Sequence, residues 1–112
     1  MTKTLHEILN GIHEITDTHV VKIPSNLTTK RRLLEILNKG LKCPEGYGTN
    51  WDAFDETITD LSWLEPKNIL LRHEDFPKLD ERDFAIYMTT LRDAIEFWQV
   101  DGKKNLFVLF GR

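Results

Sequence analysis

Residues 43–64 read CPEGYGTNWDAFDETITDLSWL and divide into a loop followed by a helix. The Pro44–Gly48 segment carries a proline and two glycines, which end a preceding helix and permit backbone angles that a side chain forbids. Asn50 can accept a hydrogen bond from a free backbone N–H group, so it is the expected N-cap. The sequence therefore predicts a helix from Trp51 to about Ser62.

The predicted helix has an apolar face and an acidic face, because side chains three and four residues apart lie together on a helix. The apolar stripe contains Trp51, Phe54, Ile58 and Leu61. The acidic face contains Asp52, Asp55 and Glu56, together with Thr59. Neighbouring like charges destabilise a helix by about 0.2–0.5 kcal/mol per pair. The face is either an ordinary solvated surface or a surface that receives a basic partner, and the pattern alone permits both.

Charge is distributed unevenly along the chain, whose net charge is −3. Residues 43–66 contain no Lys, Arg or His, and their six acids are Glu45, Asp52, Asp55, Glu56, Asp60 and Glu65. This segment therefore carries −6, and the rest of the chain carries +3. An acidic chain of this kind argues against nucleic acid as a direct ligand.

The length and composition are those of one globular domain, residues 1–112, with a sizeable core. The single cysteine forms no internal disulfide, and no CxxC pair is present for zinc. His6, His13 and His19 are interpreted as surface residues, because as metal ligands they would need a further well-placed partner. No apolar run is long enough to cross a membrane, and the N-terminus lacks a secretory profile. We expect a cytoplasmic protein without a cofactor or metal.

Helical and strand patterns alternate along the remainder of the chain. Helices are predicted at 1–16 (as an N-terminal extension), 30–42 and 81–100, and strands at 18–24, 68–73 and 106–110. Thr28 or Thr29 and Asp80 are the expected N-caps of the second and last helices. Alternating elements predict an α/β fold with a three-stranded parallel sheet flanked by helices. The first strand alternates more regularly than the second, which predicts the strand order 2-1-3.

The catalytic motifs that the sequence offers are few. No GxSxG sequence or Cys/His pair indicates nucleophilic catalysis. Asp52, Asp55 and Glu56 have the right charge for a small Mg²⁺-dependent hydrolase, but metal sites usually draw ligands from several elements rather than one helix face. We therefore predict a non-enzymatic protein and keep two alternatives, the Mg²⁺-dependent hydrolase and an acidic scaffold for another basic partner.

The run from Pro44 to Asp55, PEGYGTNWDAFD, followed by Leu61–Leu64, resembles the signature of the barstar family. Leu91–Ala94 (LRDA) and the element order from residue 18 to 110 support the resemblance, whereas the first sixteen residues lie outside the smallest members of that family. The resemblance implies a three-stranded parallel sheet flanked by helices. It also implies an immunity protein that neutralises a basic toxin by plugging the toxin's active site with residues 43–63. The expected toxin is a ribonuclease.

The resemblance also implies particular contacts with the toxin. Tyr47 would be an aromatic contact, the backbone of Gly48 and Asn50 would supply polar contacts, and Asp52 would pair with an active-site arginine. Glu56 takes the place of the family's dominant carboxylate, Thr59 matches a helix contact, and Asp93 matches an outlying acid. Asp55 and Asp60 complete the expected acidic surface. We expect a 1:1 complex, formed by a chain that is monomeric when free and binds no membrane.

Three residues depart from the family's pattern. Gly46 stands where the family has one of two neighbouring aromatic residues, which removes a stacking contact. Glu56 is one methylene longer than the aspartate of the best-known member, and Asp55 adds charge where that member has an aromatic side chain. These departures concern which toxin is bound, rather than the use of a charged plug.

Overall fold

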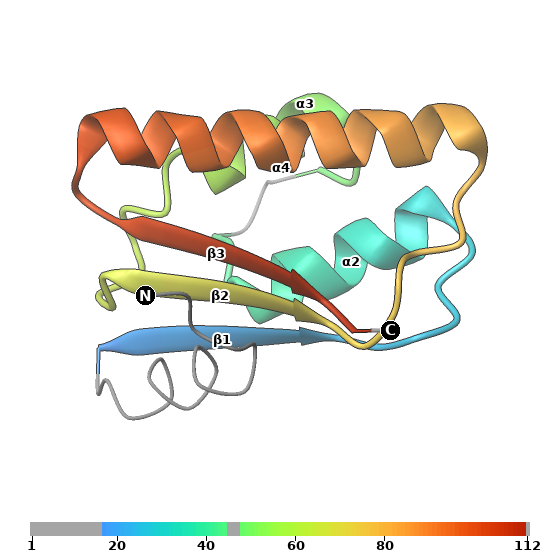
Figure 1. The fold of residues 1–112 in the computed structure, drawn as a ribbon, viewed down its shortest axis with the longest axis horizontal. Helices are drawn as coiled ribbons and strands as arrows, with labels where there is room; N and C mark the ends of the chain where they lie inside the picture. The colour runs from blue at the N-terminus through green and yellow to red at the C-terminus, as the bar shows by residue number, and fades with distance from the viewer. Residues whose placement is uncertain (1–16, 45–47, 112) are drawn as a thin grey trace, which may run out of the picture.

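The computed structural model describes residues 17–44 and 48–111, and these ranges contain three strands and three helices (Figure 1). The elements in chain order are β1 (Thr18–Ile23), α2 (Lys30–Gly40), α3 (Trp51–Ile58), β2 (Asn68–His73), α4 (Glu81–Asp101) and β3 (Asn105–Phe110). The helix expected within residues 1–16 lies outside the described residues. No helix in the described ranges is long and apolar enough to span a bilayer.

The three strands are parallel, as predicted, but their order is β1-β2-β3, so the predicted order 2-1-3 is wrong. β2 lies in the centre, and five of its six residues are buried, whereas β1 has two buried residues. The consecutive Leu70 and Leu71 of β2 suit a strand covered on both faces. Lys22 of β1 is exposed, which suits an edge strand. Continuity of apolar residues, not regular alternation, therefore indicates the central strand.

One face of the sheet carries the hydrophobic core, and the helices pack against that face (Figure 1). Aligned side chains from β1 and β2, such as Val21 and Leu71, alternate toward it. The helices contribute Leu33, Leu34, Leu37, Phe54, Ile58, Tyr87, Leu91, Ala94 and Trp98. Each fully buried side chain of this size contributes about 1.5–3 kcal/mol relative to exposure, so the core is the main source of stability.

The start of each described helix is capped by a polar side chain. Thr29 accepts a hydrogen bond from the backbone of Arg32, and Asp80 accepts one from Asp83. Asn50 accepts the equivalent bond in α3. These contacts confirm the predicted N-caps, with Thr29 rather than Thr28 capping α2.

The α3 helix ends at Ile58, four residues before the predicted end. Leu61 adopts a left-handed backbone conformation with φ 52°, and its side chain is fully buried. Such a conformation costs a side-chain-bearing residue about 1–2 kcal/mol, which burial of the leucine offsets. The turn carries Leu61 into the core, and it also removes Asp60 from the helical face.

Candidate functional site

The acidic face of α3, defined as Asp52, Asp55 and Glu56, is exposed along the helix. In residues 17–44 and 48–111 the ion pairs are Arg31–Glu35 and Arg92–Asp93, and neither includes an acid of this face. The three carboxylates therefore repel one another, and no ion pair with a cation of the described residues offsets this repulsion. The structure confirms that they share one short helix.

The start of α3 is fixed by hydrogen bonds to its backbone and its preceding loop. The Asn50 side chain accepts a bond from the Ala53 N–H group at 2.8 Å. The carbonyl oxygen of Gly48 accepts a bond from the Asn38 amide of α2 at 3.3 Å, which ties the loop to that helix. Asp52 lies in the first turn, where the positive end of the helix dipole favours a carboxylate. Tyr47, the expected aromatic contact, lies outside the described residues.

Two indole groups join α3 to α4 near both ends of the short helix. The Trp51 Nε1–H group donates to the Asp83 carboxylate at 3.0 Å, and the Trp98 Nε1–H group donates to the Ile58 carbonyl at 2.8 Å. Trp51 also lies 5.9 Å from Tyr87 between ring centroids. The acidic face is consequently presented on a helix that is held in position before any partner binds. Helical spacing predicts that Trp51 faces the core, but it does not reveal these hydrogen-bond partners.

The loop after α3 is held by hydrogen bonds from two side chains, those of Trp63 and Lys104. Trp63 donates from its indole to the Leu41 carbonyl at 2.9 Å. Lys104 is buried, and its Nζ donates to the carbonyls of Leu64 at 2.7 Å and Pro66 at 2.9 Å. Burial lowers the pKa of Lys104 below its ordinary value. Sequence patterns do not identify this lysine, which fixes the outgoing chain of the candidate site.

The remaining predicted contacts lie in different places. Thr59 caps the end of α3, and its hydroxyl donates to the Asp55 carbonyl at 2.8 Å. Asp60 is exposed in the following turn, where its carboxylate accepts a bond from the backbone of Ser62. Asp93 is exposed on α4 and lies 3.5 Å from the Arg92 guanidinium. The structure thus groups Gly48, Asn50 and the acidic face at α3, and leaves Asp93 on a second helix.

Geometry argues against metal binding by the described residues, and burial argues against a nucleophilic role for Cys43. Among the described residues, no three His, Cys, Asp or Glu side chains converge as metal ligands would, and this includes the acidic face. Burial raises the pKa of the Cys43 thiol, which keeps it protonated and weakly nucleophilic at neutral pH.

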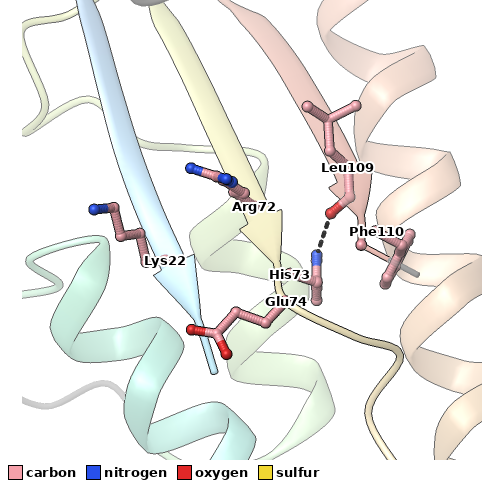
Figure 2. Close-up of a pocket in the computed structure, with 7 residues that line it drawn as sticks. Lys22, Arg72, His73, Glu74, Leu109 and Phe110 are labelled. Atoms are coloured by element: carbon pink, nitrogen blue, oxygen red, sulfur yellow. Dashed lines mark hydrogen bonds between the residues drawn. The ribbon is translucent and has the colours of Figure 1, made fainter. Parts of the chain in front are cut away.

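A hollow of about 390 Å³ lies at the carboxyl ends of the strands (Figure 2), and no residue of the acidic face lines it. Lys22 and Arg72 occupy aligned positions on β1 and β2 at its wall. The ring of His73 is buried there, and its Nδ1–H group donates to the Leu109 carbonyl at 3.0 Å. Its Nε2 accepts from the Tyr87 hydroxyl at 2.7 Å. Both nitrogens are therefore satisfied in the neutral ring, and His73 serves the core.

Comparison with known protein families places the chain in a family. A family model described as Barstar (barnase inhibitor) matches residues 5–110, which is nearly the whole chain. The matched range begins within the segment 1–16 that sequence analysis placed outside the smallest members. A search of curated proteins found no match.

Proposed function

The chain belongs to the barstar family of barnase inhibitors, and we propose that it inhibits a barnase-like ribonuclease through α3 and the preceding loop. The observation that carries the proposal is the acidic face, whose three exposed carboxylates share one helix and form no ion pair with a cation of the described residues. A ribonuclease binds a polyanion, so its active site is cationic. The α3 helix would present carboxylates where the enzyme binds phosphates.

Each residue of the acidic face has its own proposed role. Asp52, at the first turn of α3, would form charge-assisted hydrogen bonds with an arginine of the enzyme. Glu56 follows one turn later and would reach further into the cleft than an aspartate. Asp55 would bind a further cation. Because hydrogen bonds from Trp51 and Trp98 already hold the helix, little ordering entropy remains to be lost on binding.

Residues around the acidic face would complete the contact. Tyr47 would pack against the enzyme, while Gly48 and Asn50 would offer backbone groups. Thr59 and Asp60 would lie at the far end of α3. The inhibitor would act in the cytoplasm as a monomer that forms a 1:1 complex, without catalysing a reaction itself.

The proposal is tested with barnase as the probe, by measuring RNA cleavage in the presence of increasing inhibitor. One equivalent of the wild-type chain is expected to abolish cleavage. The double variant Asp52→Lys/Glu56→Lys should remain folded and lose inhibition, because two cations would then face a cationic site. The double variant Glu65→Lys/Glu74→Lys has the same net charge and changes exposed acids elsewhere, so it should inhibit normally.

Two results count against the proposal. Full cleavage in the presence of excess wild-type chain would remove the ribonuclease assignment. Equal inhibition by the wild type and Asp52→Lys/Glu56→Lys would leave an inhibitor but place its binding surface elsewhere.

A further inference from the structure

A second exposed surface lies on the C-terminal half of α4. It is a hollow of about 450 Å³ lined by Asp93, Glu96, Phe97, Val100 and Asp101, which we term the α4 patch. The spacing of these residues places them on one side of the helix. Phe97 is 42% exposed and Val100 is 89% exposed, although both side chains are large and apolar. Exposed apolar side chains grouped within a charged rim are a feature of protein-binding surfaces.

The α4 patch adjoins the end of α3. The Phe97 ring lies edge-on to Trp98, with 4.9 Å between ring centroids, and Trp98 in turn donates to the carbonyl of Ile58. Asp101 follows Asp83 by eighteen residues, which is about five helical turns, so both point in nearly the same direction. Since Asp83 accepts the Trp51 indole N–H, this flank of α4 is the one that faces α3.

Helix lengths explain why the patch is uncovered. The α3 helix has eight residues and the α4 helix has 21, which correspond to about 12 Å and about 31 Å. The shorter helix therefore covers only part of the flank, and the last turns of α4 extend beyond it. Trp98 donates to the carbonyl of Ile58, the last residue of α3, so Val100 and Asp101, which follow Trp98, lie in those turns, and Phe97 lies at their start.

The charge of the α4 patch matches that of the acidic face. Three of its five lining residues are acids and none is a cation, while Asp93 has one exposed cationic neighbour, Arg92. A partner complementary to this surface has an apolar side chain flanked by Lys or Arg. The same basic protein that fits the acidic face has the charge that the patch requires.

Asp93 of the α4 patch is already among the contacts that the family resemblance implies, and we propose that the neighbouring Phe97 is an apolar anchor for the same basic protein. The inference rests on the proposed function, and it adds an aromatic contact on α4 that selects among basic partners. Charged residues alone accept many cationic surfaces, whereas an aromatic anchor requires a matching apolar site.

The test measures the Kd of barnase for Phe97→Ala, with Phe107→Ala as the matched control. Phe107 is also partly exposed, at 36%, but lies on β3. Phe97→Ala is expected to raise the Kd about tenfold, while Phe107→Ala leaves it unchanged. Val100→Lys provides a second variant that should not disturb packing, because this side chain is largely exposed. It should also weaken binding, since it places a cation before a basic partner.

The outcomes separate this inference from the proposed function. If Phe97→Ala and Val100→Lys bind like the wild type while Asp52→Lys/Glu56→Lys does not bind, the α4 patch is not a contact region and the acidic face still is. If the wild-type chain forms no complex with barnase, both proposals are overturned. Equal weakening by Phe97→Ala and Phe107→Ala, with Val100→Lys unaffected, would indicate lost stability and would also overturn the inference.

Discussion

Acidification should destabilise this protein through His73, which folding buries in its neutral form. The ring is 1% exposed, and burial lowers its pKa from 6.5 to about 4. Because the unfolded chain binds a proton at a higher pH than the folded chain, the stability from the neutral ring is present above pH 6.5. It is lost as the pH falls from 6.5 toward 4.

The size of this effect follows from the two pKa values of His73. Each pKa unit corresponds to about 1.4 kcal/mol, so the full loss is roughly 3 kcal/mol and about 2 kcal/mol is already lost at pH 5. This is a large share of the roughly 5–15 kcal/mol that stabilises a typical domain. The variant His73→Gln cannot titrate, so its stability should change less between pH 7.5 and pH 5.

The assay is urea unfolding followed by tryptophan fluorescence, for the wild type and His73→Gln at pH 7.5, 6 and 5. His73→Gln should be less stable at pH 7.5, because it replaces a ring that contacts Tyr87 and Leu109. Its loss of unfolding free energy on acidification should be about 2 kcal/mol smaller than that of the wild type. Parallel losses in the two proteins would refute the assignment of acid sensitivity to His73.

Two further substitutions test the fold around the candidate site. Asn50→Ala removes the side chain that accepts a hydrogen bond from the Ala53 N–H group. Urea unfolding should therefore show a free energy of unfolding about 1 kcal/mol lower, and unchanged stability would contradict the assigned cap. Gly40→Ala places a Cβ atom 2.5 Å from the Cγ1 of Val21. The free energy of unfolding should fall by about 1–3 kcal/mol, which lowers the thermal unfolding midpoint. An unchanged or raised midpoint would show that this contact relaxes freely.

Local patterns in the sequence predict most of the elements, but they do not predict how distant elements pair. Asn50 and Asp80 could be identified as caps because a cap depends on neighbouring residues. The strand order depends on which strand is covered on both faces, and regular alternation in β1 gave the wrong centre. The end of α3 was missed because burial of Leu61 in a left-handed conformation is a tertiary effect.

The candidate site shows the same division between local and distant information. The acidic face follows from helical periodicity, since Asp52, Asp55 and Glu56 are close in sequence. The indole hydrogen bonds that hold α3 join residues about 30–40 positions apart, and no spacing rule predicts such contacts. Phe97 lies off the buried stripe of α4, which contains Tyr87, Leu91, Ala94 and Trp98. Its place beside the end of α3 depends on packing between distant elements, which no spacing rule predicts.

The central claim is that the acidic face occupies the phosphate-binding site of a ribonuclease. It is tested most directly by measuring the Kd of the chain for barnase with increasing concentrations of a deoxyribonucleotide, which lacks the 2′-hydroxyl needed for cleavage. Competition for one site predicts that the apparent Kd rises linearly with the nucleotide concentration, by the factor one plus that concentration divided by the Kd of the nucleotide, and does not level off. An unchanged Kd at saturating nucleotide, with all three molecules in one complex, would contradict the claim.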